Sequence, residues 1–179
     1  MNAIERAGLL WLLLLVGGVE AEPRRARPPE LFVDRGACPF ECCTYRKWTA
    51  KSTVVLQAQP SRSAPTVGVI GRGDEVRALT GLVYTRRGLF KATREEQGFV
   101  AGATVSVYTP LGEDYYRAWR NGDMVEIQIA VSPEEPRIDD WGRWQRLPHV
   151  EWWSRIRART GVEGWTREGL RFKGIDACS

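Results

Sequence analysis

The chain has few cysteines and histidines, the residues that form structural zinc sites and many catalytic sites. Its 179 residues include four cysteines and a single histidine, His149. Structural zinc sites need four thiolate or imidazole ligands, normally in two spaced pairs. Three of the cysteines instead crowd into residues 38–43, where they lack the isolation that a reactive thiol requires. We therefore expect no metal site and no catalytic cysteine, and we expect His149 to be a surface or hydrogen-bonded residue.

Loops that bind phosphate groups or dinucleotides are also missing. The Gly-Arg-Gly-Asp stretch at residues 71–74 has the composition of a turn and lacks the spacing of a cofactor-binding loop. A glycosidase needs two carboxylates across a cleft. The adjacent acids at residues 113–114 and 139–140 are candidates by residue type, but acids paired in loops are usually solvated. The sequence therefore predicts a protein without a cofactor and without catalytic activity.

Long apolar runs are confined to the start of the chain. Arg6 precedes an apolar run over residues 9–16, and Val19, Glu20 and Ala21 follow it. This order of charged, apolar and small residues is typical of a secretory signal peptide. The run is shorter than the ~20 residues that a membrane-spanning helix needs. We therefore predict a signal peptide over residues 1–21, with no stable membrane span after its cleavage.

The segment after the predicted signal peptide, residues 22–37, is rich in proline and arginine and lacks an apolar period. That composition predicts a flexible linker. A second irregular stretch, residues 132–140, contains two prolines and four acids and is expected to be a solvent loop.

An even number of cysteines in an exported chain favours disulfides over free thiols. A bond between Cys42 and Cys43 would join neighbours whose Cα atoms lie ~3.8 Å apart, which is below the usual separation in a disulfide. We expect Cys38 to pair with Cys42 or Cys43, and the remaining one of these two to pair with Cys178. Such a bond would hold both ends of the domain together.

The remaining sequence predicts β-strands, most clearly in a hairpin over about residues 150–167. Trp152, Ser154, Ile156 and Ala158 alternate with Trp153, Arg155 and Arg157, as expected for a strand with one buried face. A Thr-Gly pair at residues 160–161 supplies the turn, and residues 162–166 form the return strand.

A matching first half lies upstream. Residues 54–61 read as a strand followed by a Pro-Ser loop, and residues 66–76 as a second strand that ends in a Gly-Asp turn. Together with the closing hairpin, this pattern resembles the bacterial SH3-like (SH3b) domains. The resemblance implies an all-β fold, a small SH3-like barrel. Gln57 stands where the family frequently has an arginine.

About seventy residues separate the two halves, where an ordinary SH3b domain has a short loop, and part of this segment is a repeat. Residues 73–80 and 90–92 are echoed by residues 102–109 and 116–118. We predict an SH3-like domain over residues 38–179, with repeat units at about 54–98 and 99–131. Two arrangements remain open: two barrels that share strands, or one barrel with a second sheet docked on it.

The chain is basic, with 26 lysines and arginines against 22 acids, and it is rich in tryptophan. Because the charges of both signs are interspersed, a nucleic-acid partner is not expected. Large aromatic residues must fill much of a small core, and we assign Trp48, Trp119 and Trp152 to it. The residues predicted to line a ligand-binding groove are Trp153, Trp165, Arg155, Trp141 and Trp144.

The SH3b resemblance implies an exported, non-catalytic binding module of the bacterial cell envelope, secreted or periplasmic. Its expected partner is a peptidoglycan peptide or glycan, or another envelope component. Two alternatives remain: a cell-wall hydrolase with an unrecognised site, and a structural partner in an envelope protein complex.

Overall fold

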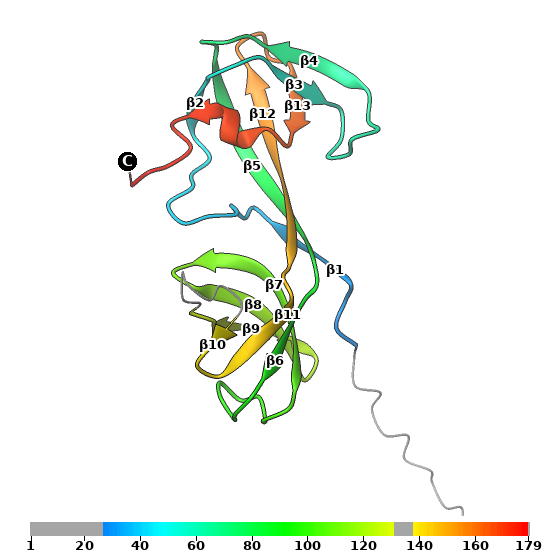
Figure 1. Ribbon diagram of the computed structural model, residues 1–179. Coiled ribbons are helices and arrows are strands. Elements are labelled where there is room, and N and C mark those ends of the chain that lie inside the picture. The colour runs from blue at the N-terminus through cyan, green and yellow to red at the C-terminus, as the bar shows by residue number, and fades with distance from the viewer. Residues whose placement is uncertain (1–26, 131–137, 179) are drawn as a thin grey trace, which may run out of the picture.

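The protein is built on one long antiparallel ribbon of two strands (Figure 1). The computed structural model describes residues 27–130 and 138–178. One arm of the ribbon is β5 (Glu75–Arg86), which continues after a single residue into β6 (Gly88–Ala92). The other arm is β11 (Gly142–Arg146), which continues into β12 (His149–Ala158). Each arm runs from one lobe of the molecule into the other, so both lobes are assembled on the same two stretches of chain.

Pairing along the ribbon extends from Val76 opposite Ala158 to Ala92 opposite Gly142. The ladder is interrupted between the pair of Arg86 with His149 and the pair of Leu89 with Arg146, and we call residues 86–88 and 146–149 the waist. Pro148 lies here and has no N–H to donate to a ladder. Gly88 leaves room for this proline, because a Cβ at Gly88 would lie 2.8 Å from the Pro148 Cδ. The waist is therefore a place where the two arms cross closely without regular pairing.

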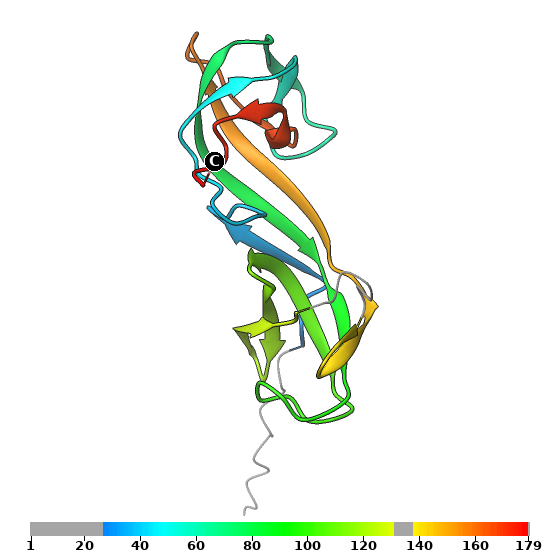
Figure 2. The ribbon, with the colours of Figure 1, turned by 60° about the vertical axis from the view of Figure 1, so that its left-hand side comes forward.

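The upper lobe is a curled sheet with the strand order β14-β2-β5-β12-β13-β3-β4 (Figures 1 and 2). Its other elements are β2 (Lys47–Ala50), β3 (Val54–Gln57), β4 (Thr66–Ile70), β13 (Glu163–Thr166), the short 3-10 turn η1 (Gly169–Arg171) and β14 (Phe172–Lys173). Trp48, Val54, Leu56 and Ile156 are fully buried in its core. The apolar residues at alternate positions of β3 and β12 point inward and fill the curl of the sheet.

The lower lobe has the strand order β10-β11-β6-β7-β8-β9. Its further strands are β7 (Thr104–Gly112), β8 (Tyr115–Arg120), β9 (Asp123–Gln128) and β10 (Ile138–Asp139). Phe90 is the centre of its aromatic core, with its ring centroid 4.5 Å from that of Trp141 and 5.4 Å from that of Trp144. The lower lobe therefore has a core of its own, separate from that of the upper lobe.

The all-β fold predicted from the sequence is confirmed, and so is the closing hairpin. Its strands are β12 and β13, and Gly161 turns the chain with a φ of +88°. Val76 and Val105 are both buried near the start of a long strand, as the repeat predicts. They lie in different sheets, however, because the first predicted repeat unit, residues 54–98, crosses the waist and contributes to both lobes.

The segment predicted to be a flexible linker, residues 22–37, contains a strand. β1 (Leu31–Arg35) pairs with β5, from Leu31 opposite Arg86 to Arg35 opposite Leu82. Asp34 in β1 accepts a hydrogen bond of 2.7 Å from Arg117 in β8, so this strand also contacts the lower lobe. The linker prediction is therefore wrong for residues 31–35, where a long-range pairing overrides the irregular composition.

The predicted signal peptide lies entirely outside the described residues. So do the start of the predicted linker and most of the predicted loop at residues 132–140. The described end of that loop, residues 138–140, differs from the prediction in part, because Ile138 and Asp139 form the two-residue strand β10. That strand pairs with β11, which places it at the edge of the lower sheet.

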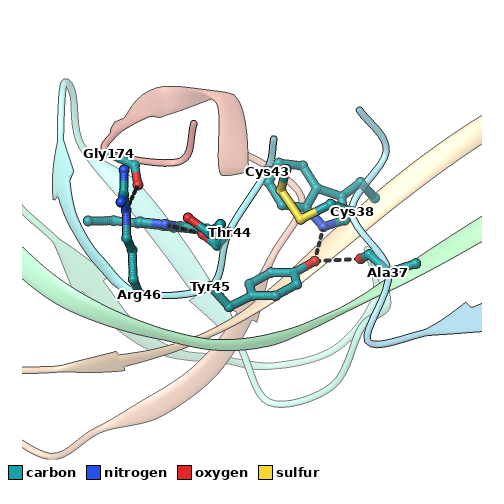
Figure 3. The surroundings of a disulfide bond; sticks show 9 residues. Ala37, Cys38, Cys43, Thr44, Tyr45, Arg46 and Gly174 are labelled. Carbon is teal, nitrogen blue, oxygen red and sulfur yellow. Dashed lines mark hydrogen bonds between the residues drawn. A yellow bond between two sulfur atoms is a disulfide. The ribbon is translucent and has the colours of Figure 1, made fainter. Parts of the chain in front are cut away.

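Two disulfides join the four cysteines as one of the expected patterns requires. Cys38 pairs with Cys43, with Cα atoms 5.7 Å apart, and Cys42 pairs with Cys178, with Cα atoms 5.6 Å apart. Figure 3 shows the first bond beside Tyr45, whose hydroxyl donates to the Ala37 carbonyl at 2.6 Å. The second bond fixes the C-terminal segment to the chain in front of β2.

Replacing Ile156 by Ala should destabilise the protein by about 2 to 4 kcal/mol, because the side chain is fully buried in the upper core and its loss leaves a cavity. Urea titration measures this change. Val69→Ala is the control, since Val69 is 60 % exposed and its truncation should change stability by less than about 0.5 kcal/mol. An Ile156→Ala variant as stable as the parent would contradict the core assignment.

The two disulfides should contribute unequally to stability. The Cys42–Cys178 bond spans 136 positions and the Cys38–Cys43 bond spans 5. In the chain-entropy model these loops correspond to about 5 and about 2 kcal/mol. Denaturant titration should therefore find the double variant Cys42→Ser with Cys178→Ser less stable than Cys38→Ser with Cys43→Ser. The reverse order would show that loop closure does not determine the contribution of these bonds.

Candidate functional site

The five residues predicted to line a ligand groove do not come together. Trp141 and Trp144 are only 3 % and 4 % exposed and belong to the lower core. The indole N–H of Trp141 donates to the Gln128 carbonyl at 3.1 Å, so its polar atom is also satisfied within the lobe. The prediction that these two residues line a ligand groove is wrong, because both pack against the ring of Phe90 in the core.

Trp153 does lie on the opposite face of β12 from Trp152, but this face is covered. Trp153 is 1 % exposed, and its indole N–H donates to Glu151 Oε1 at 2.7 Å. The other oxygen of Glu151 accepts a hydrogen bond of 2.7 Å from Arg62, in the loop between β3 and β4. This loop is therefore held against the outer face of β12, and the expectation of a solvent-facing Trp153 is wrong.

The carboxyl of Glu151 is suited to this bridging position. Partial burial acts to raise its pKa, but the hydrogen bonds from Arg62 and Trp153, with the charges of Arg62 and Arg167, outweigh burial and lower it. Glu151 therefore stays ionised and binds both partners at neutral pH. Trp153 has a structural role in this arrangement.

Trp165 and Arg155 are the two predicted site residues that lie side by side, as Cα partners of β13 and β12. Trp165 is half-buried and Arg155 is exposed, with its Nη2 2.8 Å from Glu163 Oε2. Of the three tryptophans assigned to the core, Trp48 and Trp152 are buried as predicted, whereas Trp119 is half-buried.

A different feature stands out on the upper lobe. A groove of about 820 Å³ crosses β2, β5 and the end of β12. Its lining contains five cations and one acid, which are Arg46, Lys47, Arg77, Arg157, Arg159 and Glu75. We call it the cationic groove. Its apolar lining comes from residues such as Tyr45, Ala78 and Leu79.

Three of these cations form a row across three adjacent strands. Arg77 in β5 is the Cα partner of Lys47 in β2 on one side and of Arg157 in β12 on the other. Neighbouring strands lie about 4.8 Å apart, so the row spans roughly 10 Å. Like charges directly opposite each other destabilise a sheet. The row therefore weakens the upper sheet unless negative charge lies near it.

Acids of the chain balance the two ends of the row. Lys47 Nζ lies 2.7 Å from Glu75 Oε1, and Arg157 Nη2 lies 2.6 Å from Glu163 Oε1. The hydrogen bond from Arg157 is the main reason that the pKa of Glu163 lies below its ordinary value. Within the described residues, Arg77 and Arg159 form no ion pair. The centre of the cationic groove thus carries positive charge that the described part of the chain does not neutralise.

A β-bulge shapes the groove at Leu79. Arg155 is opposite Thr80 and Ile156 is opposite Ala78, so Leu79 is the extra residue of β5. A bulge bends its strand and increases the local twist, and bulges are frequent beside functional sites. Here the bulge places the half-exposed Leu79 next to the cations, so the groove offers apolar contact as well as charge.

No described residues form a ready metal centre. The one group of close potential ligands in residues 27–130 and 138–178 is Cys42, Asp176 and Cys178, whose ligand atoms lie within 4.8 Å of one another. Both cysteines belong to the same disulfide and have no thiolate to offer. Across the same residues, no helix has the length and apolar character needed to cross a bilayer.

Comparisons with protein-family models, with curated proteins and with solved structures found no match to this chain.

Replacing Trp153 by Ala should lower the stability by about 3 to 5 kcal/mol, because this ring is almost fully buried and its N–H satisfies Glu151. Thermal and urea unfolding both measure this loss. The control Leu170→Ala truncates a side chain that is 64 % exposed and should leave the unfolding curve nearly unchanged. An unchanged melting temperature for Trp153→Ala would show that the residue does not pack as described.

Proposed function

We propose that the protein is an exported, non-catalytic binding protein of the bacterial cell envelope, and that it binds an anionic envelope polymer through the cationic groove. The observation that carries this proposal is the row of Lys47, Arg77 and Arg157, which opposes like charges across three strands. The repulsion between these charges destabilises the sheet. A negatively charged ligand that binds the row would remove this repulsion and stabilise the folded protein.

The chemistry of the groove favours a polymer with carboxylate or phosphate groups. Arginine binds both groups with two parallel hydrogen bonds, which gives strength and orientation. Cations spread over roughly 10 Å can contact charges on successive units of one ligand polymer. The apolar surface at Leu79 adds contact for the uncharged parts of a sugar or a peptide.

The two disulfides support the proposed location. Such bonds persist in oxidising compartments and are rare in the cytosol. This agrees with the signal peptide predicted for residues 1–21 and with the resemblance to SH3b domains. The curled upper sheet, which contains the hairpin of β12 and β13, is the part of the molecule that we assign to an SH3-like barrel.

The acids nearest the groove support binding rather than catalysis. Glu75 and Glu163 are each held in an ion pair with a cation of the row. A general acid needs a raised pKa so that it holds a proton at neutral pH. The pKa of Glu163 is shifted in the opposite direction, by its hydrogen bond from Arg157. These carboxylates are suited to positioning the cations.

Arg77→Gln should weaken the retention of the protein on purified bacterial cell wall by about ten- to a hundredfold, the equivalent of one charge-assisted contact. Co-sedimentation at increasing protein concentration measures this change. Arg143→Gln is the matched control, because Arg143 is an exposed arginine of the lower lobe and its replacement removes the same charge. Binding of the parent should also weaken as salt is raised.

Equal retention of Arg77→Gln and the parent would overturn the assignment of the groove. Parent protein that stays in the supernatant would overturn the envelope ligand itself. Release of soluble wall fragments by the parent would identify a hydrolase instead.

A further inference from the structure

A second group of cations surrounds the waist, where the two arms of the ribbon cross. They line a cleft of about 250 Å³ formed by Glu30, Arg86, Arg87, Arg146, Leu147 and His149. Arg86 ends β5, Arg146 ends β11 and His149 begins β12. The cleft lies ten residues along β5 from Val76 in the cationic groove. At about 3.3 Å per residue, this separates the two sites by roughly 30 Å.

The charged groups that line this cleft are unequal in number. Among the described residues of the lining, three are arginines and the only acid is Glu30, which is ion-paired with Arg87. Arg86 and His149 are Cα partners across the ribbon and both are exposed. Protonation of His149 would therefore place two cations directly opposite each other, in the arrangement that sheets disfavour.

The arginines of the cleft have hydrogen-bond donors without acceptors. The buried Nε of Arg87 has no partner, although its terminal nitrogens reach Glu30 and, at 3.5 Å, Ser106 Oγ. Arg146 uses its Nε for the Arg87 carbonyl at 3.2 Å, which leaves its terminal nitrogens for another acceptor. Within residues 27–130 and 138–178, the side chain of Arg86 forms no ion pair or hydrogen bond. Unused donors around a small basic cleft are what a compact anion requires.

We propose that the waist cleft is a second anion site, which binds a sulfate or phosphate group between Arg86, Arg146 and His149. A tetrahedral oxyanion offers acceptors on several sides and so can bind donors from both arms of the ribbon at once. It also supplies the negative charge that the pair of Arg86 and His149 lacks. This site is independent of the cationic groove and does not rest on the proposed envelope ligand.

Binding at this site is coupled to the protonation of His149. An anion beside the ring favours the imidazolium form, because the two charges attract. By linkage, the protonated ring favours the anion to the same degree. The other charged groups that line the cleft are Arg86, Arg87, Arg146 and Glu30.

His149 reports on the site directly, because it is the only histidine of the chain. In an untagged protein, its ring protons give a single set of NMR signals that can be followed as a function of pH. Sodium sulfate is the probe, since its charge is constant over this range, and sodium chloride at equal ionic strength is the reference. Sulfate should move the titration midpoint to higher pH, and the change should saturate.

Arg146→Gln should abolish most of the change that sulfate causes in the His149 titration midpoint. Arg86→Gln should have the same effect, and it tests the site if Arg146→Gln does not fold. Arg143→Gln removes an arginine of the lower lobe outside the cleft and should respond like the parent. Titration at fixed pH with inorganic phosphate and with glycerol phosphate then distinguishes a free anion from an esterified phosphate group.

The absence of a saturable change in the parent would overturn the site. An equal change in the parent and in both cleft variants would also overturn it, by placing the anion elsewhere. Arg77→Gln should keep the sulfate response, and the cleft variants should keep wall binding, so failure of one proposal leaves the other measurable.

Discussion

The antiparallel pairing of β5 and β6 with β12 and β11 is the constraint on which the other parts of the molecule depend. β2 is added to β5 and β13 to β12, which curls the upper sheet, while β7 is added to β6 in the lower sheet. Each core lies at its own end of the ribbon, with Ile156 in the core of the upper lobe and Phe90 in the core of the lower lobe. Loss of register in the ribbon would therefore disturb both lobes together.

Short sequence patterns predicted the elements that depend on residues close together in the chain. Alternation in residues 152–158 correctly separates the buried Ile156 from the exposed Arg155 and Arg157. Gly161 marks the turn because it adopts a positive φ. The short distance between Cys42 and Cys43 disfavoured a bond between them and left two patterns, of which the structure has Cys38 with Cys43 and Cys42 with Cys178.

Features that depend on pairing between distant segments were not visible in the sequence. Alternation gives the face of Trp153 but not the loop that Arg62 holds over that face. β1 forms because β5 offers it an edge, although its own surroundings are rich in proline. The cationic row requires the registers of β2, β5 and β12 together, and its three members lie far apart along the chain.

The Cys42–Cys178 bond has a mechanical consequence. It turns the chain between these residues into a covalently closed ring that contains β2 to β14. If the protein is pulled by segments outside the ring, the force loads the ribbon only through β1 and otherwise passes from Cys42 to Cys178 through the sulfur atoms. β1 lies outside the ring and would peel from β5 under such tension. Both lobes would keep their shape while the molecule is held by its ends.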